Sequence, residues 1–279
     1  MVFAAWCSGV CGSHCIAVAE GNIPQQWKTA IITRVLKVSK PTQPSDFRPI
    51  SITLVLLRLF EKHIVRTYIY PALQNQPPGL YFDDQFAFRP NDSTTVAIIA
   101  LFHIILTMLS TNPFVRVFAL DLSEAFVTIR HATLMDKMAR LELPDQTCNW
   151  IKDFFDDHSH CTKYSGKIST CANVQASVIQ GSGLGPATYL VTAADLRPVH
   201  RGNKVVKFTD DTYVIVIVPA EENRETCATE LSHVTDWAER NNLRLNCAKT
   251  KEIVFRAKAN EDAQRRYRYR ATALNVSLA

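Results

Sequence analysis

The sequence predicts an α+β fold, and three observations predict it. Short runs rich in β-branched and aromatic residues, such as 115–120 and 212–218, indicate buried strands. A longer stretch at 221–241 carries apolar residues at helical spacing, which indicates an amphipathic helix. The chain has 279 residues, of which 47% are hydrophobic and 20% charged, ordinary values for a globular protein with a sizeable core. Strands mixed with helices packed to one side are typical of an α+β domain.

Each element follows from local signals. Pro71 is expected to end one helix, Ser93 offers a cap to another, and Pro186 suits the first turn of a third. The two strands around Asp210 and Asp211 predict a hairpin with this acidic pair at its tip, although the turn has no glycine. In chain order, the expected strands cover 28–38, 115–122, 171–179, 205–209, 212–218 and 251–255, and the expected helices cover 1–21, 53–70, 93–109, 132–141, 145–157, the residues after 186, and 221–241.

The net charge of +5 is modest but unevenly placed. Residues 25–66 contain eight Lys or Arg against two acidic residues, and residues 256–270 contain six against two. Clustered positive charge suits a phosphate-bearing partner, and the alternative is a solvated surface.

The eight cysteines are scattered and predict no disulfide framework in a chain of this length. Cys7, Cys11, His14 and Cys15 form a local cluster, which is either a zinc site or one apolar helix face. The first twenty residues lack a basic start and contain Gly, Ser and His, so neither a signal peptide nor a membrane span is expected. An intracellular location, nucleus or cytoplasm rather than secreted, is therefore predicted.

Three acidic residues carry the strongest chemical signal. Asp121 closes the apolar run 115–120, and Asp210 and Asp211 lie side by side between two further apolar runs. Carboxylates at the ends of buried strands are unfavourable unless positive charge neutralises them, and adjacent ones repel each other. Two divalent metal ions would remove this penalty, and three converging carboxylates suit two-metal phosphoryl transfer. The alternative is two unrelated acidic turns.

Several motifs follow one another along the chain, at 46–51, 85–90, 118–126, 180–186 and 208–211 (FTDD), with Trp237 and the segment 242–250 after them. In this order they resemble the two fingers motifs, the first catalytic strand, the Gln-Gly segment, the aromatic-X-Asp-Asp box and the segment that follows it in the reverse transcriptases of non-LTR (LINE-like, jockey-type) retrotransposons. The resemblance covers roughly residues 22–256. The resemblance implies the fingers and palm of a right-hand polymerase, with an antiparallel palm sheet, and it implies Mg²⁺ (two ions, with Mn²⁺ as an alternative) on Asp121, Asp210 and Asp211.

The resemblance also assigns expected roles to side chains that hold the nucleotide. Phe126 falls at the steric-gate position that would exclude a ribose 2′-hydroxyl, its alternative being an ordinary core phenylalanine. Lys37 and Arg48 fall where the fingers grip the triphosphate, with Lys40 as a substitute for Lys37 and surface charge as the alternative for each lysine. Gln180 and Gly181 would place an amide and a backbone without Cβ close to the nucleotide. Lys249 would protonate the leaving pyrophosphate, or is simply a solvated lysine.

The chain departs from the family pattern at several positions. Glu124 stands where the family usually has lysine, Val127 where it usually has a second aspartate, and Thr209 where alanine is common. The expected organisation is a helical segment at 1–21, a reverse transcriptase domain at 22–256 (fingers about 22–114, palm about 115–256) and a basic tail at 257–279. Thumb and endonuclease segments are expected to be absent from this chain.

The leading hypothesis is an RNA-directed DNA polymerase that acts on an RNA template, a DNA primer and deoxynucleoside triphosphates. The second hypothesis is a catalytically weak remnant that binds RNA or an RNA–DNA duplex in a salt-sensitive manner. A third is an RNA-templated RNA polymerase, against which Phe126 argues.

Overall fold

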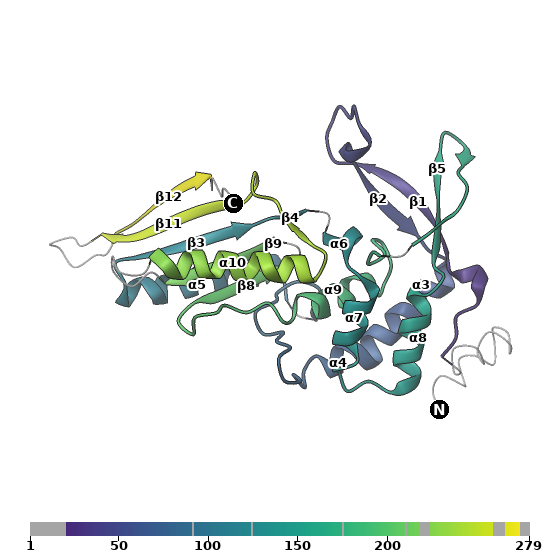
Figure 1. Ribbon diagram of the computed structural model, residues 1–279, viewed down its shortest axis with the longest axis horizontal. Helices are drawn as coiled ribbons and strands as arrows, with labels where there is room; N and C mark the ends of the chain where they lie inside the picture. Colours follow the sequence, from purple (N-terminus) through teal and green to yellow (C-terminus); the bar gives the residue numbers. More distant parts are fainter. Residues whose placement is uncertain are drawn as a thin grey trace. The chain divides into compact units, whose positions relative to one another are not determined.

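The computed structural model describes residues 21–258, except 91, 124, 175, 210 and 218–223, together with residues 266–273. The chain divides into two compact units, each treated by itself below. The first unit comprises Met1–Pro78 and Phe126–Val191, and the second comprises Gly79–Ala125 and Thr192–Ala279. Figure 1 shows both units and their elements.

The first unit contains a mixed sheet with the strand order β2-β1-β5-β6, in which β7 also pairs with β5. Strand β1 pairs antiparallel with β2 and parallel with β5, so it lies between them. The bounds are β1 Thr29–Leu36, β2 Phe47–Ile52, β5 Ser159–Tyr164, β6 Lys167–Ile168 and β7 Ala172–Asn173.

Helices supply the buried core of the first unit. Trp150 and Phe154 of α8 stack with ring centroids 5.7 Å apart, and both are almost fully buried. The helix expected over 53–70 is interrupted, because a π-helical turn divides it and Pro71 lies inside the short helix that follows. The bounds are η1 Gln25–Trp27, η2 Pro44–Asp46, α3 Val55–Ile64, η3 Val65–Ile69, α4 Tyr70–Ala72, α6 Ala125–Thr128, α7 His131–Met138, α8 Asp145–Phe155 and α9 Gly185–Ala193.

The second unit contains a five-stranded antiparallel sheet with the order β12-β11-β3-β9-β8 (Figure 1). Strand β3 occupies the centre, as expected for a run of buried apolar residues. A two-stranded ladder of β4 and β10 continues from it. The bounds are β3 Phe114–Leu120, β4 Leu122–Ser123, β8 Lys204–Phe208, β9 Asp211–Ile217, β10 Arg244–Leu245, β11 Lys251–Lys258 and β12 Arg266–Ala273.

Helix α5 (Thr94–Thr111) packs its inner face on this sheet, and α10 (Arg224–Arg240) completes the unit. Ile105, Met108 and Leu109 of α5 form a buried cluster with Val115 and Val117 of β3. Helix α5 is long and apolar enough to cross a membrane, and only 22% of it is buried, in part through this packing on the sheet. Its N-terminus is capped as expected, since Ser93 Oγ accepts the Val96 N–H.

Several elements differ from the expectation. The strand expected over 171–179 is reduced to β7, and neither β2 nor β5 follows from the local sequence pattern. Strand β12 lies inside the segment expected to be a basic tail, and it pairs with β11 along its full length. The structure also joins Cys161 to Cys171 in a disulfide, a pairing that the scattered cysteine spacing did not predict. The cluster at Cys7 and the helix expected at 1–21 lie outside the described residues, apart from Gly21.

Candidate active site

The centre of the second unit's sheet places Asp121 beside the acidic hairpin. Leu120 of β3 pairs with Thr212 of β9, and one further step along this antiparallel register leads to Asp121 and Asp211. Antiparallel neighbours have Cα atoms about 4.5–5.5 Å apart. The backbones of two predicted ligands, ninety positions apart in the chain, therefore meet at one end of the sheet. Asp210 lies outside the described residues.

The turn of the β8–β9 hairpin is conformationally unusual. Phe208 pairs with Asp211, so only Thr209 and Asp210 connect the two strands. Two-residue hairpin turns require positive φ angles, which glycine and asparagine adopt most easily. Thr209 has a φ of 56° despite its β-branched side chain. Backbone strain of this kind is concentrated at functional sites, and it accompanies the acidic pair here.

The segment 246–250 folds against Asp121. The Asp121 carbonyl accepts the Asn246 N–H at 2.7 Å, and the buried Thr250 hydroxyl donates to the Asn246 carbonyl at 2.9 Å. This loop brings Lys249 Nζ to 3.7 Å from Asp121 Oδ2. The Lys249 side chain is 70% exposed, so the pair is screened by water and its ammonium is accessible to a ligand.

In the first unit, the Gln180–Gly181 segment is held against β2. The Ser51 N–H donates to the Gln180 carbonyl at 2.8 Å. Gly181 has a φ of 108°, and a Cβ at this position would lie 2.5 Å from the Ser51 carbonyl oxygen. The close approach that requires glycine is thus to the backbone of β2. The proximity of Gly181 to a nucleotide stays a prediction.

Gly181→Ala should destabilise the first unit by about 3 kcal/mol, because the added methyl group meets backbone and the φ angle is unfavourable. The matched control is Gly166→Ala, where φ is also positive, at 77°, but no atom lies within 4 Å of the new Cβ. That control should lose only about 1 kcal/mol. Urea unfolding of both variants measures the difference, and equal losses would refute the close contact with Ser51.

Glu61 of α3 anchors the loop that follows Gly181. Its side chain is fully buried, and its Oε2 accepts the Leu184 N–H at 2.9 Å. Burial raises the pKa of the Glu61 carboxyl to about 7, although the N–H donors of this loop and the Arg58 guanidinium act in the opposite direction. A carboxyl group thus titrates near neutral pH beneath the predicted nucleotide-binding segment.

This raised pKa predicts a stability change with pH. The folded chain holds the Glu61 proton up to about pH 7, whereas the unfolded chain releases it near pH 4.5. The free energy of unfolding should therefore fall as pH rises between these values, by about 3 kcal/mol from this group. Urea unfolding at pH 4.5 and pH 8 should show a smaller fall for Glu61→Gln than for the wild type. Identical falls in the two proteins would contradict the assignment.

The remaining predicted nucleotide-binding residues lie on two other parts of the first unit. Phe126 of α6 stacks on Tyr189 of α9, with ring centroids 4.7 Å apart, and is half-buried. Lys37 follows β1 and Arg48 lies on β2, so both belong to one hairpin, and both are exposed. Asp46 organises the connection by accepting the Thr42 and Gln43 N–H groups, and these bonds lower its pKa. The gate role of Phe126 stays a prediction.

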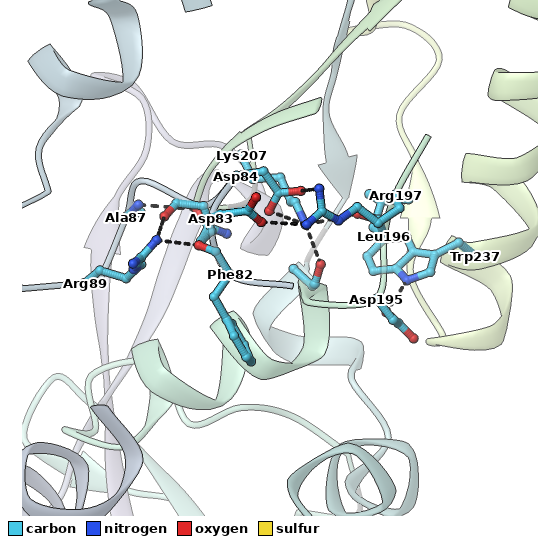
Figure 2. A network of polar contacts seen from close by, with 12 residues as sticks. Phe82, Asp83, Asp84, Ala87, Arg89, Asp195, Leu196, Arg197, Lys207 and Trp237 are labelled. Carbon is cyan, nitrogen blue, oxygen red and sulfur yellow. Dashed lines mark hydrogen bonds and ion pairs between the residues drawn. The ribbon is translucent and has the colours of Figure 1, made fainter. Parts of the chain in front are cut away.

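A buried ion pair under the acidic hairpin was not foreseen from the sequence. Lys207 of β8 is 1% exposed, and its Nζ lies 3.0 Å from Asp84 Oδ1 (Figure 2). The same Nζ donates to the carbonyls of Ala193 and Leu196 at 2.8 and 3.1 Å. Burial lowers the pKa of Lys207, and Asp84 opposes that shift by stabilising the charged ammonium. The pair fixes β8 two residues before the strained Thr209.

Arg197 extends this network to the surface. Its guanidinium donates to Asp83 Oδ1 at 2.6 Å and stacks on the Tyr81 ring at 3.9 Å. Trp237 of α10 donates to Asp195 Oδ1 at 2.7 Å (Figure 2). Two backbone hydrogen bonds complete the attachment: the Phe86 N–H donates to the Lys207 carbonyl, and the Lys207 N–H donates to the Asp84 carbonyl. The fingers-like motif at 85–90 is therefore docked on β8 within the second unit. The only sequence signal was Lys207 itself, a cation inside an apolar strand.

The donor set at the end of the sheet is chemically suited to magnesium. Asp121 supplies carboxylate oxygens that remain partly exposed, with 31% of the side chain accessible. Within the part of the chain that the structure describes, no group of three His, Cys, Asp or Glu side chains forms a metal site. A complete ligand set would need Asp210, which the described residues do not include.

Comparisons with known proteins found a family model and several proteins that are similar to this chain. Residues 38–270 match the family model described as reverse transcriptase (RNA-dependent DNA polymerase). The chain is 28% identical over 241 residues to the probable RNA-directed DNA polymerase from transposon X-element of Drosophila melanogaster, covering 84% of this chain and 26% of that protein. It is 27% identical over 248 residues to the RNA-directed DNA polymerase from mobile element jockey of the same fly, with the same coverage. The chain thus spans about a quarter of the length of these relatives.

Solved structures show the same fold. Telomerase from Candida tropicalis in complex with a TWJ fragment of telomeric RNA superposes with a TM-score of 0.60 at 14% identity, over 84% of this chain and 42% of that chain. The apo telomerase truncated from its C-terminal domain gives a TM-score of 0.54 at 16% identity, over 91% and 56% of the two chains. The predicted α+β right-hand polymerase fold is confirmed.

Proposed function

Because the chain belongs to the reverse transcriptase family, with residues 38–270 matching its model, we propose that it transfers deoxynucleotides to a primer 3′ end as directed by an RNA template. The observation that carries the proposal is the β3–β9 register, which places Asp121 beside Asp211. The proposal concerns a segment that spans about a quarter of its curated relatives.

Asp121, Asp210 and Asp211 would hold two Mg²⁺ ions, with Mn²⁺ as a substitute. Such ions, when bound, lower the pKa of the primer 3′-hydroxyl and stabilise the departing pyrophosphate. The chain supplies the framework: the paired strands β3 and β9 fix the carboxylate-bearing backbones. The buried Asp84–Lys207 pair fixes β8 behind them.

The other predicted residues would orient the nucleotide. Lys249, whose exposed side chain lies next to Asp121, would donate a proton to a pyrophosphate oxygen. Gln180 would present its amide to the base pair from a loop held by Ser51 and Glu61. Lys37 and Arg48 would bind the triphosphate from the β1–β2 hairpin.

Primer extension tests this function. The purified chain is mixed with an RNA template, an annealed DNA primer and four deoxynucleoside triphosphates. Extended products should form with Mg²⁺, and none should form after EDTA treatment. Extension without divalent ions would refute two-metal catalysis. Salt-sensitive RNA binding without any extension would instead support the alternative of an inactive binding remnant.

The steric-gate role of Phe126 predicts a change in sugar selectivity. Phe126→Ala removes the ring and should raise ribonucleotide incorporation relative to deoxynucleotide incorporation by roughly 10- to 100-fold. The control is Tyr189→Phe, which keeps an aromatic partner for the Phe126 ring. Unchanged selectivity in Phe126→Ala, with extension retained, would favour the core alternative.

A further inference from the structure

A pocket of about 440 Å³ lies within the second unit, away from the acidic turn. Its apolar lining includes Tyr81, Phe86, Ile104 and Val205. Lys204 begins β8, whereas Thr209 follows its end. Of the β8 residues that line the pocket, Val206 lies nearest to Thr209, three residues away, so at about 3.3 Å per residue the lining stops roughly 10 Å along the strand from the turn. It is therefore a separate site from the predicted metal centre.

Basic side chains outnumber acidic ones in the lining of this pocket, with His200, Arg201, Lys204 and Arg197 against Asp83 and Asp84. His200, Arg201 and Lys204 are exposed, and none of them forms an ion pair with any residue that the structure describes. The fourth basic residue, Arg197, is held in place by Asp83 and by stacking on Tyr81. The lining thus combines aromatic and apolar side chains with an excess of basic ones, and its two carboxylates are paired with Arg197 and Lys207.

The basic loop is fixed before any ligand binds. Glu230 of α10 is 1% exposed, and its two carboxylate oxygens accept the N–H groups of Val199 and His200, each at 2.9 Å. Its Oε1 also accepts from the buried Asn203 side chain at 2.8 Å. A buried carboxylate that makes three hydrogen bonds holds residues 199–203 in one conformation. A site on this loop would lose little conformational entropy on binding.

We propose that this pocket is a second nucleic-acid site, which binds a single-stranded segment through its phosphates and one base. Cationic side chains beside an aromatic surface are the chemistry that binds single strands. Arg201 and Lys204 would contact phosphates, and a base would lie against the apolar lining beside Tyr81 and the Arg197 guanidinium. The pocket volume suits one nucleotide unit. The proposal rests on the proposed function, since it supplies RNA to the same polymerase unit.

The test measures binding of a fluorescent 20-nucleotide single-stranded RNA without Mg²⁺ or nucleotides. The pocket variant is Arg201→Gln/Lys204→Gln, and the matched control is Lys152→Gln/Arg240→Gln, which removes the same charge from exposed helix positions. The pocket variant should bind roughly tenfold more weakly at about 100 mM salt. Its slope of log Kobs against log salt should become shallower by about 1.4. Tyr81→Ala should weaken binding without changing the slope.

A photocrosslink locates the contact. RNA carrying 4-thiouridine should crosslink to peptides that contain Tyr81–Phe86 or Arg197–Val206, and the pocket variant should lose these crosslinks. Equal weakening by the pocket and control variants, or crosslinks confined to other peptides, would overturn the proposal. A pocket variant that loses affinity for a glutamate-rich peptide but keeps its RNA affinity would also overturn the proposal.

The two proposals fail in distinguishable ways. Absence of primer extension by the wild-type chain, with pocket-dependent RNA binding intact, would refute the polymerase activity and leave the pocket standing. Normal extension with unaltered RNA binding by the pocket variant would refute the pocket and leave the polymerase standing. Circular dichroism of each variant shows whether it is folded.

Discussion

Asp121→Asn should lower the rate of primer extension by about 10³-fold or more. Asparagine keeps the size of the side chain but removes the negative charge that would bind Mg²⁺. A loss of about 4 kcal/mol of transition-state stabilisation corresponds to this factor. Asp121 is partly exposed, so the substitution should leave the melting temperature nearly unchanged. Single-nucleotide incorporation under saturating substrate measures the rate.

The control for this variant is Asp136→Asn, an exposed-helix carboxylate on α7 in the other unit, which should extend primers normally. Asp210→Asn should match the effect of Asp121→Asn. Extension by Asp121→Asn at the control rate would show that Asp121 is not a metal ligand.

Asp84→Ala should destabilise the second unit by about 3–5 kcal/mol. The substitution leaves the Lys207 ammonium buried without its carboxylate, and removing one member of a buried pair has a cost of this order. The matched control is Asp83→Ala. Asp83 pairs with Arg197 at the surface with 61% of its side chain exposed, so its loss should cost less than about 1 kcal/mol.

A double variant separates buried charge from lost packing. Asp84→Leu/Lys207→Met removes both charges, and it should be more stable than Asp84→Ala, because no unpaired charge remains. Urea unfolding followed by tryptophan fluorescence, to which Trp237 contributes, measures all of these variants. If Asp84→Ala unfolds at the same urea concentration as Asp83→Ala, the pair does not stabilise the hairpin strand.

The elements that sequence could predict are those with strong local patterns. The strand 115–120 was found because it is a short apolar run, and the helix after Ser93 was found because it is a long apolar stretch that begins at a capping residue. The strand β2 was missed because it contains Pro49, which is unusual in a strand interior, and because it is an edge strand that pairs only with β1 among the described strands. Strand β12 was missed because its alternating Arg and Tyr residues resemble a basic tail until β11 provides a partner.

The site residues also fall into those that the sequence could predict and those that it could not. Asp121, Asp211 and Lys249 were identified by motif resemblance, and the sheet register and the 246–250 loop explain why they are close. Their roles stay predictions. Glu61 and the Asp84–Lys207 pair were not predicted, because their meaning depends on partners more than 100 positions away in the chain. The position of Lys207 inside an apolar strand is a local signal, but it does not reveal the carboxylate that pairs with this lysine.

The central claim is that Asp121 and the acidic turn bind metal ions together. Iron-directed cleavage tests it most directly: with added hydrogen peroxide and ascorbate, Fe²⁺ bound in place of Mg²⁺ reduces the peroxide to hydroxyl radicals that cut the backbone nearby. Cuts are expected in both 119–123 and 208–213, suppressed by excess Mg²⁺ and lost in Asp121→Asn. Cuts in only one of these segments, or cuts that persist unchanged in Asp121→Asn, would contradict it.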